Sequence, residues 1–184
     1  MTHQKNSGSP LTRFVERLST VLVMVVALLL AWRLVEDRLT GANNNHGMHT
    51  PNPGRGLNIP DVQYGAKATL VLALSTNCHF CQQSVPFYQR LVKMRSSAGD
   101  ELKIVAVLPQ DESSSSTYLK QQGITVDRLF SKPLSTISVR GTPTLILLDA
   151  GGKVLKSWPG LLNAGREKEV LSAIQSLCKT CTAI

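Results

Sequence analysis

The stretch STNCHFCQQSVPFYQRL, residues 75–91, places two cysteines, Cys78 and Cys81, three positions apart. It follows a continuous apolar run, residues 68–75, which has the length and composition of a buried strand. Apolar residues at helical spacing then predict a helix over residues 85–95. A cysteine pair between a buried strand and a helix is the feature from which both the fold and the chemistry are inferred.

The position of this pair predicts redox chemistry. The first turn of a helix has unpaired N–H groups and a partial positive charge, so a thiolate at Cys78 is stabilised and its pKa is expected below the free value of about 8.5. Since the thiolate is the nucleophile in disulfide exchange, Cys78 is the expected attacking thiol and Cys81, one turn later, the resolving thiol. His79 adds a titratable cation beside Cys78, and Phe80 is expected to pack or to face the substrate. Pro86 predicts a kink in the helix.

From Leu57 onward, strand and helix patterns alternate along the chain. Besides the elements named above, the patterns predict strands over residues 102–109, 144–149 and 153–158 and helices over residues 115–123 and 165–177. Ala150-Gly151-Gly152 gives a hairpin signal between the last two strands. This order predicts an α/β fold with a mixed sheet, in which the first two strands, being apolar throughout, are interior.

The CxxC after a strand and the later stretch VRGTPTLILLDAGGKVLKSWPG, residues 139–160, together resemble the thioredoxin superfamily. The resemblance implies a thioredoxin-like fold, a cis bond before Pro143, and a Pro143 that faces the CxxC pair and shapes the substrate groove. It also implies that the backbone of Thr142 pairs with an extended substrate segment.

Within that superfamily, the sequence resembles the membrane-anchored thioredoxin-like redoxins, which are similar to alkyl hydroperoxide reductase and thiol-specific antioxidant proteins. This subgroup serves extracytoplasmic disulfide exchange, including cytochrome c maturation. It inserts a helix and a strand before the proline loop, and residues 112–133 fit that insertion.

The sequence departs from the family pattern in three places. Asn77 stands where the familiar motif has Trp, His-Phe replaces the usual dipeptide between the cysteines, and the strand over residues 68–75 has no acidic residue. A histidine beside the thiolate favours an oxidant or isomerase, whereas the subgroup favours a reductant. Both directions of electron flow remain open from the sequence.

Residues 18–35, LSTVLVMVVALLLAWRLV, predict an uncleaved membrane anchor because the run ends without a small-x-small cleavage site. A cleaved signal peptide is the alternative. The predicted organisation is a cytoplasmic tail (1–17), a transmembrane anchor (18–35), a flexible linker (36–56) and a thioredoxin-like domain (57–184). The domain is expected on the periplasmic side of the inner (cytoplasmic) membrane. A membrane electron donor or acceptor is a hypothesis that would explain the tether.

Cys178 and Cys181 form a second CxxC pair after the last predicted helix. A local disulfide that pins the C-terminal tail and a relay that exchanges electrons with the first pair are both open, as are metal binding and free thiols. About a hundred residues separate the two pairs, which argues against one zinc site made of both. The net charge of +8 has no interleaved aromatic residues, so a nucleic-acid partner is not expected.

The expected function is thiol–disulfide exchange with protein thiols and disulfides, with no bound cofactor and no metal because the dithiol is the redox group. A peroxiredoxin-like peroxidase is one alternative, although Val71 stands where that motif has proline and Ser75 where it has threonine. A copper-binding chaperone is another, although no histidine follows His79. A static Cys78–Cys81 disulfide is the third.

Overall fold

The computed structural model describes residues 23–28, 50–57, 59, 66–178 and 180–181. The chain divides into two compact units, residues 1–44 and 45–184. In the first unit, residues 23–28 are helical and exposed. The predicted tail (1–17) and most of the predicted anchor (18–35) lie outside the described residues. Among the residues that are described, no helix is both long enough and apolar enough to cross a membrane.

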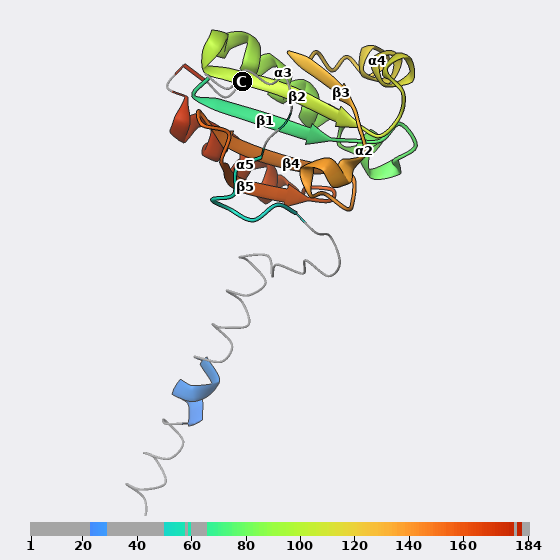
Figure 1. Ribbon diagram of the computed structural model, residues 1–184. Coiled ribbons are helices and arrows are strands. Elements are labelled where there is room, and N and C mark those ends of the chain that lie inside the picture. The colour runs from blue at the N-terminus through green and yellow to red at the C-terminus, as the bar shows by residue number, and fades with distance from the viewer. Residues whose placement is uncertain (1–22, 29–49, 58, 60–65, 179, 182–184) are drawn as a thin grey trace, which may run out of the picture. The chain divides into compact units, whose positions relative to one another are not determined.

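The second unit is built on a mixed five-stranded sheet with the strand order β3-β2-β1-β4-β5 (Figure 1). β1 is parallel to β2, β2 is parallel to β3, and β4 is antiparallel to both β1 and β5. The strands are β1 (Ala68–Ala73), β2 (Leu102–Leu108), β3 (Arg128–Ser131), β4 (Thr144–Asp149) and β5 (Val154–Pro159). The predicted mixed sheet and the interior position of its first two strands are confirmed.

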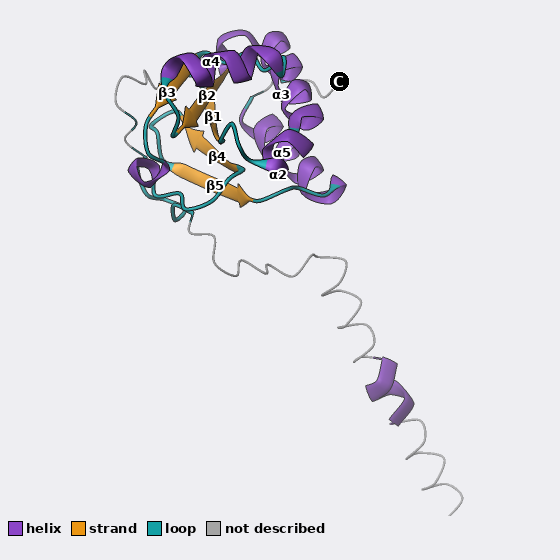
Figure 2. Cartoon of the chain, turned by 90° about the vertical axis from the view of Figure 1, so that its right-hand side faces the viewer, coloured by secondary structure: helices purple, strands orange, loops and turns teal. Residues whose placement is uncertain are grey.

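Three long helices pack on one face of this sheet (Figure 2). They are α3 (Val85–Ala98), α4 (Glu112–Gln121) and α5 (Ala164–Leu177), and the short α2 (His79–Gln83) precedes α3. Two 3-10 helices, η1 (Gly99–Glu101) and η2 (Leu134–Ile137), complete the elements. The helix and strand predicted within residues 112–133 are therefore confirmed as α4 and β3.

β1 lies at the centre of the core, and all six of its residues are buried. Leu70 and Leu72 point to the helix-covered face, and Val71 and Ala73 belong to the smaller apolar cluster on the other face. A strand covered on both faces has no polar side to expose, which explains its continuous apolar sequence.

The domain begins earlier than Leu57, the boundary expected from the sequence. Gly54 N–H donates to the Val154 carbonyl (2.7 Å), Leu57 N–H donates to the Gly152 carbonyl (2.9 Å), and the Ser157 hydroxyl donates to the Pro51 carbonyl (3.2 Å). Residues 51–57 thus run along β5, although residues 51–56 were assigned to the linker. These residues are rich in Asn, Gly and Pro and have no periodicity, so no local pattern indicates this pairing.

Two helix boundaries also differ from the expected ones. The helix after the cysteine pair is interrupted at Ser84, and Pro86 lies in the first turn of α3, where its missing N–H needs no partner. The predicted kink is therefore a break two residues before the proline. α4 begins three residues before the predicted start because Asp111, and not a serine, caps it by accepting from Ser114 N–H (2.9 Å).

Candidate active site

Cys78 lies directly before the first residue of α2 and acts as its N-cap. It forms a disulfide with Cys81, with a Cα–Cα distance of 5.1 Å. The sulfur of Cys78 accepts a hydrogen bond from the backbone N–H of Cys81 at 3.1 Å, and Cys78 N–H donates to the Ser75 carbonyl at 3.2 Å. The Cys78 sulfur is thus held where helix N–H groups point, which is the environment predicted for a stabilised thiolate.

The two sulfurs differ in their access to solvent. Cys78 is half-buried, whereas Cys81 is fully buried in the main apolar core. A macromolecular partner can therefore reach Cys78 before it can reach Cys81. This asymmetry agrees with Cys78 as the attacking thiol and Cys81 as the resolving thiol.

Gln110, which is not among the residues predicted from the sequence, holds the loop that precedes Cys78. Its side chain donates from Nε2 to the Ser75 hydroxyl (2.9 Å), and its Oε1 accepts from Thr76 N–H (3.4 Å). The Gln110 carbonyl accepts from the hydroxyl of Ser115, which is fully buried at the start of α4. A position near Cys78 could have been predicted for Gln110, because parallel strands end at the same edge of a sheet and Gln110 closely follows β2.

The Thr142–Pro143 bond is cis, as the family resemblance implies. Thr144 pairs with Ala73 in the sheet, so the proline loop lies at the end of β1 from which the CxxC segment begins. Pro143 is buried, and its carbonyl accepts from Gly160 N–H at 2.7 Å. Within the described part of the chain, no hydrogen bond to the backbone of Thr142 is found. That backbone is free to pair with an incoming segment.

His79 and Phe80 both lie on the outer surface of α2. His79 Nε2 is 3.0 Å from Nε2 of Gln83, one turn later, and its ring centre is 5.9 Å from that of Phe80. Among the described contacts, none joins the imidazole to the Cys78 sulfur, so a catalytic role for His79 stays a prediction. Phe80 is 52% exposed and places an apolar surface beside the redox pair.

The surroundings of the pair contain neither a metal-binding cluster nor a buried acid among the described residues. No group of three or more His, Cys, Asp or Glu side chains could hold a metal ion there. The buried polar side chains are those of Thr69, Ser84, Ser115 and Thr144, with no carboxylate. The buried core of the described chain therefore contains no carboxylate.

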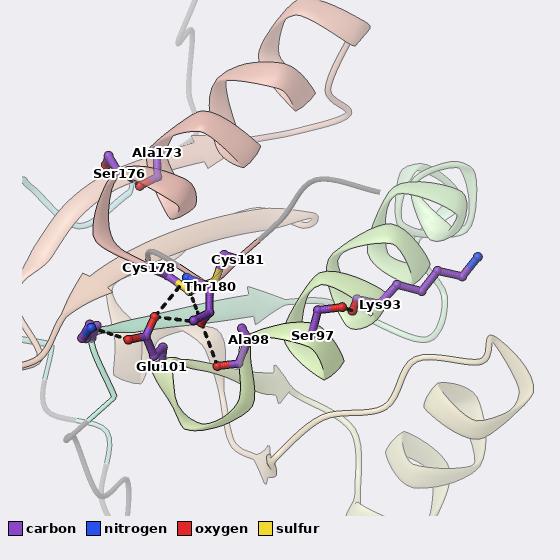
Figure 3. The surroundings of a disulfide bond; sticks show 10 residues. Lys93, Ser97, Ala98, Glu101, Ala173, Ser176, Cys178, Thr180 and Cys181 are labelled. Atoms are coloured by element: carbon purple, nitrogen blue, oxygen red, sulfur yellow. Dashed lines mark hydrogen bonds and ion pairs between the residues drawn. A yellow bond between two sulfur atoms is a disulfide. The ribbon is translucent and has the colours of Figure 1, made fainter.

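The second cysteine pair forms a buried disulfide at the end of α5. Cys178 is the C-cap of α5, and the exposed fractions of Cys178 and Cys181 are 1% and 3%. Between them, the Thr180 hydroxyl contacts the Ala98 carbonyl (3.3 Å) and Glu101 Oε2 (2.8 Å), as Figure 3 shows. Hydrogen bonds from Lys67 and Thr180 lower the pKa of Glu101 to about 2. The hydrogen bonds of Thr180 thus hold the segment that contains this disulfide against η1.

The two disulfides lie at opposite ends of the sheet. Ala98 and Glu101 precede Leu102, which pairs with Ala68 at the beginning of β1, whereas Cys78 follows the end of β1. Six residues of strand span about 20 Å. Sulfur atoms must touch to exchange, so this arrangement favours a structural role for Cys178–Cys181 over a direct relay within one chain.

We predict that Gln110→Leu slows alkylation of reduced Cys78 at pH 7 up to about tenfold, because the variant loses two hydrogen bonds that position the loop. The rate is measured from pH 5 to 9, and its midpoint is expected to move upward. Gln89→Leu is the matched control, since Gln89 donates to the Gln122 carbonyl away from the site. An unchanged pH profile in Gln110→Leu would show that the glutamine does not position Cys78.

We also predict that replacing both Cys178 and Cys181 with serine lowers the free energy of unfolding by about 2 kcal/mol, the value expected for a short disulfide loop. Exchange at Cys78 should stay within twofold of the unmodified protein. Urea unfolding and single-turnover exchange measure the two quantities. A large loss of exchange in a folded variant would favour the relay.

Solved structures with a similar fold come from several bacteria. One is the thioredoxin domain of a thiol-disulfide oxidoreductase from Bacteroides vulgatus (TM-score 0.53, 17% identity, 67% of this chain and 98% of that chain). Another is a thiol-disulfide isomerase from Corynebacterium glutamicum (TM-score 0.51, 15% identity, 73% and 97%). A third is a thiol:disulfide interchange protein from a Bacteroides species (TM-score 0.51, 17% identity, 69% and 88%).

No protein-family model and no curated protein sequence matches the chain. The structural likeness, the mixed sheet, the cysteine pair at the start of α2 and the cis proline at the same edge agree with one another. The domain has the thioredoxin fold.

Proposed function

We propose that this protein exchanges disulfides with protein partners through Cys78 and Cys81. The observation that carries the proposal is the Cys78 sulfur at the N-terminus of α2, half-buried and at the same edge of the sheet as the loop of Thr142 and Pro143. The structural neighbours described as thiol-disulfide oxidoreductases and isomerases support the same chemistry.

Each turnover moves two electrons. In the reducing direction, the Cys78 thiolate attacks one sulfur of a substrate disulfide, and the other substrate sulfur leaves as a thiolate. Cys81 then gives up its proton, and its thiolate attacks the Cys78 sulfur. This step forms the Cys78–Cys81 disulfide and releases the second substrate thiolate. The oxidising direction is the reverse of these steps.

The substrate segment would bind across the loop of Thr142 and Pro143. The backbone of Thr142 offers an N–H and a carbonyl, as in strand addition, and Pro143 would shape the groove. Phe80, which is 52% exposed, would supply an apolar contact on the other side of Cys78. The resemblance to the thioredoxin family supports these roles.

We further propose that residues 18–35 anchor the domain outside the cytoplasmic membrane. The apolar run itself supports an anchor, and two disulfides suit an oxidising compartment. The described chain enters the domain at residues 50–51, and Pro51 contacts Ser157 near the end of β5 that pairs with Thr144. The chain therefore enters the domain at the end of the sheet where the CxxC pair lies. A tether attached at this end would favour a membrane protein as the electron donor or acceptor.

The peroxidase and copper-chaperone alternatives gain no support from a specific observation. Val71, at the proline position of the peroxidase motif, is buried in mid-strand and pairs with both Val105 and Ile146. His79, the histidine nearest the two sulfurs in sequence, contacts Gln83.

The test uses the reduced domain, residues 45–184, and a synthetic disulfide-bonded peptide. Cys81→Ser should accumulate a mixed disulfide between Cys78 and the peptide, which mass spectrometry detects. Cys78→Ser, the matched control, should form no adduct and lose exchange. Exchange that persists in Cys78→Ser would refute the proposed role of this pair.

A further inference from the structure

A pocket of about 360 Å³ lies on the side of the sheet opposite the long helices, between the N-terminal segment of the domain and the η2 loop. Its polar lining consists of Arg55, Arg140, Thr50, Asn52, Ser135 and Ser138. Two arginines and three residues with hydroxyl groups therefore line one space, and no acidic residue of the described chain lines it. This composition is suited to an anion with several acceptor oxygens.

The two arginines have no acidic partner within the part of the chain that the structure describes. Among those residues, the ion pairs use Lys67, Arg90, Arg95, Lys103 and Lys156, and neither Arg55 nor Arg140 takes part. Several other basic residues in the described part of the domain are also unpaired, but Arg55 and Arg140 are the two that line a common cavity. Their positive charge is available to a ligand.

The pocket also has a defined place relative to the redox site. Arg140 lies two residues before Thr142, and Thr50 and Pro51 line the pocket where the chain enters the domain. The Pro51 carbonyl accepts from Ser157, whose strand partner Ile146 lies two residues after Thr144. In Figure 1 the described segment that starts at residue 50 begins at the α2 end of the sheet. A ligand here would lie beside Arg140, which leads into the proline loop, and beside Thr50 and Pro51, where the described chain enters the domain.

We infer that the pocket lined by Arg55 and Arg140 binds a phosphate group. A phosphate accepts bidentate hydrogen bonds from guanidinium groups and has further oxygens for the hydroxyls of Thr50, Ser135 and Ser138. The group could belong to a membrane lipid or to free inorganic phosphate. Residues 50–184 contain 15 Lys and Arg against 9 Asp and Glu, which favours an anionic surface.

The lipid form of the inference rests on the proposed membrane anchor. An anionic headgroup bound by Arg55 and Arg140 would hold the pocket face of the domain, which has the proline loop at one side, toward the bilayer. Cys78 would then be presented to a partner embedded in the membrane. The pocket would set the orientation of the domain at the membrane. The exchange chemistry at Cys78 would not depend on ligand binding in the pocket.

The experiment measures binding of the domain, residues 45–184, to vesicles of phosphatidylcholine with and without 30% phosphatidylglycerol at about 0.1 M salt. The Arg55→Gln/Arg140→Gln variant should lose about 20- to 30-fold in affinity for the anionic vesicles, since each arginine near such a surface contributes about a factor of five. Lys93→Gln/Arg128→Gln is the matched control, because both residues are exposed and it removes the same charge. The control should change affinity by less than about threefold.

A calorimetric titration with inorganic phosphate separates the two sources. Vesicle binding that depends on Arg55 and Arg140 and that 10 mM phosphate does not displace supports a lipid phosphate. Phosphate binding that depends on the same arginines, without vesicle binding, supports free phosphate as the ligand. If neither probe binds in a manner that depends on these arginines, or if the control variant loses as much, the inference is overturned. Peptide exchange at Cys78, assayed in parallel, shows independently whether the proposed function holds.

Discussion

The hydrogen bond from Cys81 N–H to the Cys78 sulfur is the interaction on which the account of this protein depends. It exists because β1 ends at Ala73 and a short loop delivers Cys78 to the first turn of α2. The same N–H that now points at a disulfide sulfur would point at a thiolate after reduction. The neighbouring strands support this position: β2 leads to Gln110, which holds the loop, and β4 follows directly on the cis proline.

The two ends of the sheet carry different features. The redox pair, the proline loop and the entry of the chain lie at the end where β1 finishes, and the arginine pocket extends from Arg140 near this end to Arg55 beside the start of β5. The second disulfide lies at the other end, beneath Thr180 and its contact with Glu101. The redox pair and the entry of the chain are therefore grouped at one end of the sheet, and the second disulfide and the hydrogen bonds of Thr180 lie at the other end.

Much of this arrangement followed from local sequence patterns. Continuous apolar runs predicted the interior strands, and the position of Cys78 between a strand and a helix predicted its place as a helix cap. What the sequence did not reveal depends on pairings between distant segments. Gln110 has no motif and acquires its role only because β1 and β2 are parallel neighbours. Residues 51–57 have no strand pattern, yet β5 supplies hydrogen-bond partners for them. The contact of His79 with Gln83 depends on the phase of α2, which the motif alone does not fix.

The most direct test of the central claim is the alkylation rate of each cysteine in the reduced domain, followed by mass spectrometry between pH 5 and 9. We predict that Cys78 reacts at least about tenfold faster than the buried Cys81 at pH 7. We also predict that the Cys78 rate has its midpoint below about 8.5, the pKa of a free cysteine. Equal rates at the two sulfurs, or a midpoint at or above that of free cysteine, would contradict a thiolate stabilised by the start of α2.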